Sequence, residues 1–338
     1  MKGRTDAVAV VAVLLCCTVI LGEYLTYADI HDYNATAEWN EDTIDFTVSS
    51  NGSDAYSAVL MNSHGRAPTS ALTILYDDGY EGRYRNISDA GRATYMDQDL
   101  YRSEVKSALK MRGFTNVDSC DFASLKTFVD STMDEATGRG LLVTTYALPA
   151  EVYDGTPESP LLKWISNGGT LYWAGSEIGS YCIDDGNLIE ITNNQTLLFG
   201  KDCLNVGGPV IADTRDSNGF CEALALKSSG CMFSMNTRDV SGSLALGYET
   251  DGYSTISFTA FGNGQICIFG GPSSLSLIED IAQVIASDVS YSTEIVKVDT
   301  GVVTRSTVSG SFPASDGAST VYIFTGGYYL NYGRVFHE

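Results

Sequence analysis

Three acidic residues that could bind a ligand follow a stretch with the pattern of a buried strand. Residues 71–76, ALTILY, are nearly all apolar, and Asp77, Asp78 and then Glu81 come after them. Ligands of open α/β sheets bind at the carboxyl ends of the strands, and carboxylates suit calcium or sugar hydroxyls. We therefore predict a ligand contact through Asp77, Asp78 and Glu81; the alternative is that these residues only shape a turn.

A second candidate loop ends the stretch 161–179, LLKWISNGGTLYWAGSEIG. The apolar residues up to position 165 have helical spacing, and the Asn-Gly-Gly that follows is typical of a helix end. Residues 170–174 are apolar enough for a strand buried on both faces. Ser176 and Glu177 come directly after this strand, so we predict that they belong to a loop that binds a ligand or has a structural role.

Nucleophilic catalysis is not predicted for either loop. Ala174 stands where the G-x-S-x-G pattern around Ser176 requires glycine, and the three histidines, His31, His64 and His337, lie outside the α/β domain. We therefore predict no catalytic residue. Carboxylates such as Glu177 could still pair for glycoside hydrolysis, which leaves a carbohydrate-active enzyme as an alternative.

Cysteines and sequons suggest an exported chain. Six cysteines outside the N-terminal segment could form three disulfides, and we expect the local pairs Cys182–Cys203 and Cys221–Cys231 first. The candidates are Cys120, Cys182, Cys203, Cys221, Cys231 and Cys267. Without a CxxC pair or nearby histidines, neither a metal site nor a cofactor is predicted. The predicted glycosylation sites are Asn34, Asn51, Asn86 and Asn194.

The amino terminus has the pattern of a signal anchor. Lys2 and Arg4 precede the apolar residues 7–22, and acidic sequence follows. We predict a membrane helix in residues 1–30 and an extracytoplasmic location for the remainder. The formal charge of −22, with only 20 Lys and Arg residues, excludes a nucleic-acid partner, because such binding needs clustered positive charge.

The elements between positions 67 and 289 alternate between strand and helix. This alternation predicts an α/β fold with a doubly wound, mostly parallel sheet. The predicted N-terminal membrane helix precedes it, and the terminal strands are expected to form a small β module. The predicted divisions are 1–30 (anchor), 31–66 (stalk and β-hairpin), 67–289 (α/β domain) and 290–338 (C-terminal strands).

Four stretches resemble the class I glutamine amidotransferase-like fold, in its ThuA-like and GIFT-type branches. They are ALTILYDD at 71–78, the turn Arg112-Gly113-Phe114, residues 161–175, and ICIFGGPSS at 266–274. Enzymatic members of this family have a Cys or Ser after the third strand, whereas Ala147, Leu148 and Pro149 stand there in this chain. The resemblance implies the non-catalytic branch.

Together these features favour a membrane-anchored, extracytoplasmic, non-catalytic protein that binds a partner protein or a glycan at the cell surface. One alternative is a carbohydrate-active enzyme that uses acidic residues at the strand carboxyl ends. Another is a subunit of a surface filament or envelope assembly.

Overall fold

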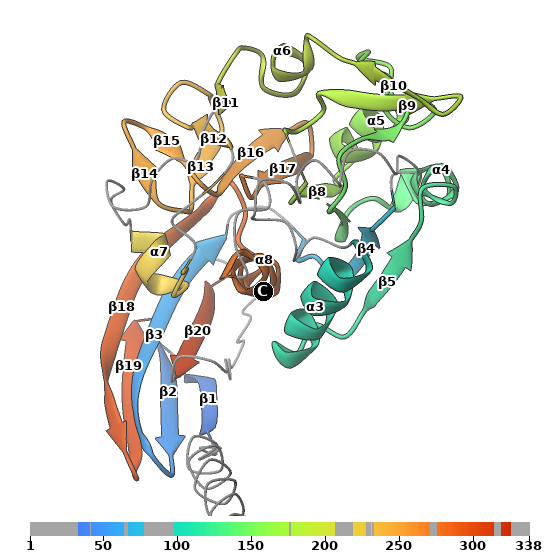
Figure 1. Cartoon of the computed structure of the whole chain (residues 1–338). Coiled ribbons are helices and arrows are strands. Elements are labelled where there is room, and N and C mark those ends of the chain that lie inside the picture. Colours follow the sequence, from blue (N-terminus) through green and yellow to red (C-terminus); the bar gives the residue numbers. More distant parts are fainter. Residues whose placement is uncertain are drawn as a thin grey trace, which may run out of the picture.

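The computed structural model describes most of the chain after the amino-terminal segment. The described residues are 33–40, 42–63, 67–77, 98–175, 177–206, 219–227, 231, 233–270, 276–313 and 319–325. They form twenty strands and six α-helices (Figure 1). A large mixed sheet with helices lies at one end of the molecule, and a β-sandwich made from both ends of the chain lies at the other.

The central sheet has seven strands in the order β13-β16-β17-β8-β6-β4-β5. The last five strands of this order run parallel, while β13 and β16 are antiparallel additions at one edge. Leu75, Val143 and Trp173 are in register across β4, β6 and β8, so these three strands end at the same edge. The strand bounds are Ser243–Ala245, Ser257–Phe261, Gly264–Ile268, Thr170–Trp173, Arg139–Val143, Ala71–Leu75 and Val117–Cys120, in sheet order.

Helices cover both faces of this sheet. Helices α3 (Gln98–Met111) and α8 (Ser276–Ser287) pack on one face, where Ile74, Leu142 and Tyr172 point into their core. Helices α4 (Leu125–Ser131) and α5 (Pro160–Ser166) pack on the other face, over Leu141 and Trp173. A 3₁₀ turn, Met133–Glu135, follows α4. The inner strands β6, β8 and β17 are buried on both faces and are mostly apolar. The edge strand β5 exposes Asp118 and Ser119.

The junction of α5 with β8 is one of the tightest packing points of the sheet. Trp164 is fully buried, and its indole nitrogen donates a hydrogen bond to Thr132 Oγ1 over 3.0 Å. Gly168 has a φ of +117°, a conformation that favours glycine. A Cβ at Gly169 would lie 2.5 Å from the Trp164 ring. The Gly-Gly pair therefore lets the helix end directly against the strand that follows.

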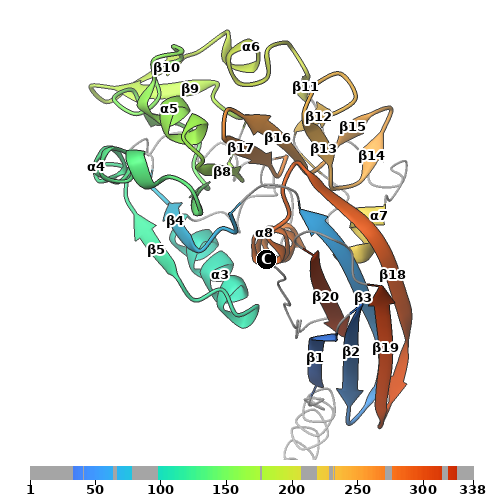
Figure 2. The same ribbon diagram turned by 180° about the vertical axis from the view of Figure 1, so that it is seen from behind.

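Strands from the two ends of the chain pair with each other in the sandwich (Figure 2). One sheet is β1 (Tyr33–Asn40), β2 (Thr43–Ser50) and β19 (Thr307–Pro313), and the other is β18 (Thr293–Thr304), β3 (Ser53–Ser63) and β20 (Ser319–Thr325). Alternate residues of β3 face different cores: Ala58 and Leu60 face the sandwich, whereas Val59 and Met61 pack with α8 and the central sheet. This strand therefore joins the two parts of the molecule.

Two small sheets complete the described fold. One contains β10 (Asn187–Glu190), β9 (Tyr181–Asp184) and β7 (Leu148–Pro149), and the other contains β11 (Leu204–Val206), β12 (Phe233–Asn236), β15 (Tyr253–Ser254) and β14 (Glu249–Thr250). The short helix α6 (Asn194–Phe199) comes between β10 and β11 in the sequence, and the short helix α7 (Gly219–Ala223) packs against β3 and β18.

The predicted fold class is wrong for the chain as a whole. Strands dominate, they belong to five sheets, and ten of the fifteen strand pairings are antiparallel. The physical reason is that strands from the two ends of the chain, far apart in the sequence, pair antiparallel in the sandwich. Hairpins such as β9–β10 and β16–β17 add further antiparallel neighbours.

The predicted N-terminal membrane helix is also not supported. In the part of the chain that the structure describes, no helix is long and apolar enough to cross a membrane. Residues 1–30, to which the helix was assigned, lie outside that part.

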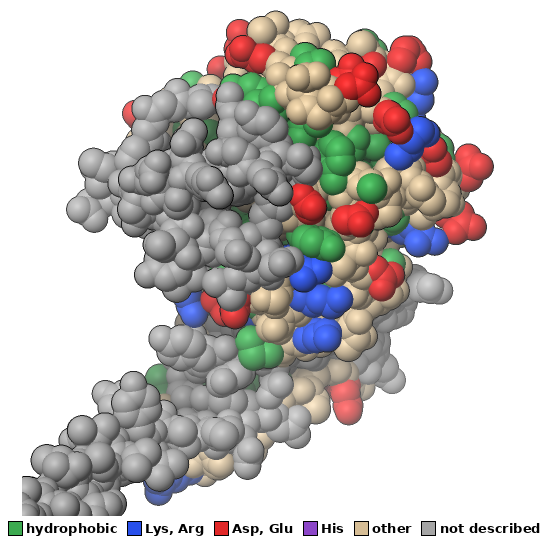
Figure 3. Space-filling model, turned by 45° about the vertical axis from the view of Figure 1, so that its right-hand side comes forward, with side chains coloured by type: hydrophobic (Ala, Val, Ile, Leu, Met, Phe, Trp, Pro, Cys, Tyr) green, Lys and Arg blue, Asp and Glu red, His purple; other side chains and the backbone are tan. Residues whose placement is uncertain are grey.

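The exposed side of α3 is unusual for so acidic a chain. Arg and Lys side chains gather in a row on this part of the surface (Figure 3). Elsewhere on the same view, acidic side chains are the more numerous.

Candidate functional site

The carboxyl edge of the parallel strands holds two of the predicted ligand residues. Asp77 is exposed just after β4, and Glu177 is partly buried in the loop after β8. Strand β6 lies between these strands, so the two chain segments are about 10 Å apart at the edge. The other three predicted residues, Asp78, Glu81 and Ser176, lie outside the described residues.

Small and hydroxyl residues close the end of β6 between those two segments. Thr144 Oγ1 donates a hydrogen bond of 2.5 Å to the Leu75 carbonyl, and Thr145 Oγ1 donates one of 3.3 Å to the Ala147 carbonyl. Gly175 is required by close approach, because a Cβ there would lie 1.8 Å from the Thr145 carbonyl oxygen. Both threonine hydroxyls are therefore committed to backbone contacts.

Aromatic side chains surround this edge. The Arg102 guanidinium lies 3.9 Å from the ring centroid of Tyr76, a cation–π contact. Tyr146 and Tyr181 stack with centroids 4.7 Å apart, and each is partly buried. Tyr172 and Trp173 of β8, by contrast, are fully buried core. The sequence did not predict the stack of Tyr146 on Tyr181, because no local pattern shows which loop tyrosine stacks on Tyr181.

The cysteine thiols are not activated for nucleophilic chemistry. Cys120, Cys182, Cys203 and Cys267 are buried free thiols, so the predicted pair Cys182–Cys203 is not formed in this structure. Burial raises the pKa of all four, that of Cys203 to about 12. A thiol with a raised pKa stays protonated at neutral pH and is a weak nucleophile. Cys221 and Cys231 are also buried, and the Cys221 thiol donates to the Leu246 carbonyl over 3.4 Å.

The sequons have different surroundings. Asn51 is exposed in the turn between β2 and β3, and Asn34 lies on β1. Asn194 is buried, and its amide nitrogen donates to the Ile178 carbonyl over 2.7 Å and to Ser180 Oγ over 3.2 Å. A glycan on that nitrogen would have to break these contacts. Asn86 lies outside the described residues.

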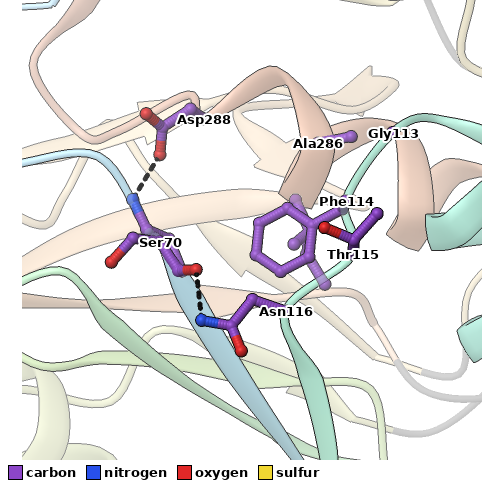
Figure 4. A pocket seen from close by; sticks show the side chains of 9 residues that line it. Ser70, Gly113, Phe114, Thr115, Asn116, Ala286 and Asp288 are labelled. Atoms are coloured by element: carbon purple, nitrogen blue, oxygen red, sulfur yellow. Dashed lines mark hydrogen bonds between the residues drawn. The ribbon is translucent and has the colours of Figure 1, made fainter.

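A cavity of about 200 Å³ lies at the opposite, amino edge of the sheet (Figure 4). Three separate segments form it: the residues before β4, the turn between α3 and β5, and the end of α8. Its lining residues are Thr69, Ser70, Gly113, Phe114, Thr115, Asn116, Ile285, Ala286 and Asp288. Sequence reasoning did not find this cavity, because no motif links residues so far apart in the chain.

Hydrogen bonds to the segment before β4 hold the polar side chains of this cavity. Asp288 Oδ1 accepts a hydrogen bond of 2.8 Å from the Thr69 amide, and Asn116 Nδ2 donates one of 3.1 Å to the Ser70 carbonyl. Figure 4 shows the Asp288 and Asn116 side chains at two sides of the cavity, with the Phe114 ring beside them. The cavity thus presents a carboxylate, an amide oxygen and an aromatic ring within one small space.

A second hollow lies at the same edge, at the starts of β6, β8 and β17. Its volume is about 350 Å³, and its lining residues are Ala67, Thr137, Asn167, Gly168, Gly262, Asn263 and Tyr291. The segment 67–70 lines both hollows. Among the residues that the structure describes, no cluster of three His, Cys, Asp or Glu side chains could hold a metal ion.

Comparison with known proteins identifies no family. No family model and no curated protein matches the chain. The amidotransferase-like resemblance therefore stays a prediction.

The structure is similar to parts of solved glycoside hydrolases. A β-galactosidase from the Antarctic haloarchaeon Halorubrum lacusprofundi matches 67% of this chain with 13% identity and a TM-score of 0.41. An exo-β-1,4-mannosidase from Opitutaceae bacterium strain TAV5 matches 67% with 12% identity and a TM-score of 0.33. A β-galactosidase from Rahnella sp. R3 matches 66% with 15% identity and a TM-score of 0.36. The matches span 31%, 35% and 31% of those chains, about a third of each.

Proposed function

We propose that the chain is a non-catalytic glycan-binding protein and that the amino-edge cavity with Phe114, Asn116 and Asp288 holds a sugar ring. The single observation that carries the proposal is the combination of these three side chains around a cavity of about 200 Å³. A pyranose ring has hydroxyl groups at its rim and C–H groups on its faces, so it needs both kinds of contact.

The chemistry of the lining suits a neutral sugar. The Asp288 carboxylate and the Asn116 amide oxygen can accept hydrogen bonds from sugar hydroxyls. The face of the Phe114 ring carries negative electrostatic potential, which attracts the C–H groups of a sugar face. Asp288 accepts a hydrogen bond from the Thr69 amide, and Asn116 donates one to the Ser70 carbonyl. These bonds keep both side chains in place before a ligand arrives, which lowers the ordering cost of binding.

The non-catalytic part of the proposal is supported by the carboxyl edge. The Thr144 and Thr145 hydroxyls donate to backbone carbonyls, and burial raises the pKa of the Cys120 and Cys182 thiols. A nucleophile needs a nearby base or a lowered pKa instead.

The proposal is tested by titrating neutral mono- and oligosaccharides into the purified chain in a calorimeter. Thr115 is exposed at the cavity rim, so T115W should fill the cavity and abolish binding without unfolding the protein. T307W places the same bulk on an exposed position of β19 and serves as the matched control. D288N keeps an acceptor for the Thr69 amide and should weaken sugar binding about tenfold, the loss of one charge-assisted hydrogen bond. Binding by T115W equal to that of the wild type contradicts the proposal.

A carbohydrate-active enzyme at the carboxyl edge is the second candidate, because Asp77 and Glu177 follow two strands of the same parallel sheet. It predicts hydrolysis of chromogenic glycosides, and loss of that activity in D77N or E177Q. Hydrolysis that T115W leaves unchanged, but E177Q abolishes, would favour this enzyme over the binding protein.

A further inference from the structure

The outward side of α3 carries two rows of side chains with four-residue spacing. Arg102, Lys106 and Lys110 form one row, and Ser103, Ser107 and Met111 form the row beside it. Positions four apart lie one above the other on a helix, so each row spans about 12 Å. The core side of the helix is formed by Tyr101, Val105, Ala108, Leu109 and Arg112, all of them buried.

The cationic row is an exception on a strongly acidic protein. The chain has 42 Asp and Glu residues against 20 Lys and Arg residues, yet three of those cations share one helix face. Figure 3 shows Lys and Arg side chains gathered on the surface over α3. Glu104 lies at least about 120° around the helix from each of the three cations, at 100° per residue. Asp99, however, lies three residues before Arg102, on the same side of the helix. The positive charge of this face is therefore carried mainly by Lys106 and Lys110, towards the end of the helix.

Contacts at both ends of the helix hold this face in place. The Arg102 guanidinium lies over the Tyr76 ring at 3.9 Å. At the other end, Arg112 forms an ion pair with Glu279 of α8. A fixed helix loses little conformational entropy when a partner binds, and this raises affinity.

The neighbouring row offers an apolar contact and a shallow surface. Met111 is 53% exposed, and it is the only helical residue among the five large apolar side chains that are exposed in the described part of the chain. Methionine is flexible and polarizable, so it adapts to different apolar partners. Ser103 and Ser107 are exposed and small, so they leave room for the side chains of a packed helix.

We propose that this face of α3 docks an amphipathic, acidic helix of a partner protein. Acidic side chains of the partner, four residues apart, would meet the cationic row, and an apolar side chain would cover Met111. Charge complementarity alone suits an anionic polysaccharide equally well. The exposed Met111 favours a polypeptide, because a sugar chain has no aliphatic side chain to pack on it. The docking face is separate from the amino-edge cavity, so it does not depend on glycan binding.

The test uses fluorescence anisotropy with the full chain and two labelled 20-residue helical peptides. The first peptide has Glu at positions i, i+4 and i+8 and Leu in the adjacent row, and the second has Ser in place of Leu. We expect the Leu peptide to bind more tightly than the Ser peptide. M111S should remove that difference. Added salt should weaken both complexes, because it screens exposed charges.

Variants of the lysines test the contribution of the cationic row to peptide binding. K106Q/K110Q should weaken binding of the Leu peptide about five- to tenfold, the effect of removing two exposed ion pairs. K126Q/K201Q removes two exposed lysines elsewhere, each next to an aspartate, and should bind as the wild type does. Equal binding by K106Q/K110Q and the wild type overturns the proposal. The proposal is also overturned if the protein binds polygalacturonate more tightly than the Leu peptide and M111S changes neither affinity. That result would favour an anionic polysaccharide as the partner.

Discussion

Replacing Arg112 by methionine should destabilise the protein, because this guanidinium ties α3 to α8 from a buried position. The side chain is only 7% exposed. Its Nη1 donates to the Ala108 carbonyl over 3.0 Å, its Nε donates to Gln283 Oε1 over 3.1 Å, and it pairs with Glu279. Methionine fills a similar volume but donates none of these hydrogen bonds.

The expected cost follows from the acceptors that lose their donor. Ala108 O and Gln283 Oε1 each lose a hydrogen bond worth about 1 kcal/mol. The Glu279 side chain is 35% exposed, so water partly replaces its partner, and the lost ion pair adds only about 0.5 kcal/mol. R112M should therefore lower the free energy of unfolding by roughly 2–3 kcal/mol. E279Q should cost less, because Arg112 keeps its other two acceptors.

Urea unfolding of the wild type, R112M, E279Q and the double variant measures these terms. A loss of 2–3 kcal/mol moves the unfolding midpoint by about 1 M urea. The double variant should cost less than the sum of the single variants, since both remove the same ion pair. A loss below about 0.5 kcal/mol in R112M, typical of a surface change, would refute the assignment of Arg112 as a buried tie between the helices.

Three further predictions concern the thiols, one glycine and one carboxylate. Burial raises the pKa of Cys120, Cys182, Cys203 and Cys267, so these thiols should react slowly with a disulfide reagent at pH 8 and rapidly after unfolding; fast labelling of the native protein would contradict their placement. G169A should cost at least about 2 kcal/mol in urea unfolding, as overpacking does, because the added Cβ meets the Trp164 ring at 2.5 Å. The Ser124 hydroxyl and amide donate to Asp121 and hold its pKa below the usual range. Because the folded pKa is depressed, this contribution to stability is complete above about pH 4 and is lost as the pH falls through the folded value. D121N should therefore show a weaker loss of stability on acidification than the wild type.

Local patterns predicted several elements correctly because a few residues decide them. The apolar spacing and the Asn-Gly-Gly of 161–174 predicted a helix and a strand, and the structure has α5 at Pro160–Ser166 and β8 at Thr170–Trp173. Within the region 31–66, where a β-hairpin was predicted, the structure has β2 at Thr43–Ser50 with Ile44, Phe46 and Val48 buried. In each case the pattern reflects one face that must be buried.

Other features depend on long-range contacts that no local pattern reveals. The terminal strands were expected to form one small β module, but β18 and β19, on either side of a turn at residues 305–306, belong to different sheets. Arg305 takes a φ of +44° in that turn, and an arginine is not a recognisable turn signal. The amino-edge cavity was missed for the same kind of reason, since Phe114, Ser70 and Asp288 meet only after the sheet and α8 have packed.

The pairing of β3 with β18 and β20 has a consequence for how the chain is made. Ser53 and Thr304 contact each other across a sequence separation of 251 residues. During synthesis, β2 and β3 leave the ribosome long before their late partners β18, β19 and β20 are made. One edge of β2 and both edges of β3 therefore stay unpaired until those strands are synthesised. Contacts between residues so far apart in the sequence form slowly. Strand edges that stay unpaired in the meantime are prone to aggregation. We expect a nascent chain that ends before residue 293 to depend on chaperones. Pairing of β18, β19 and β20 with β2 and β3 would then be the last step of folding.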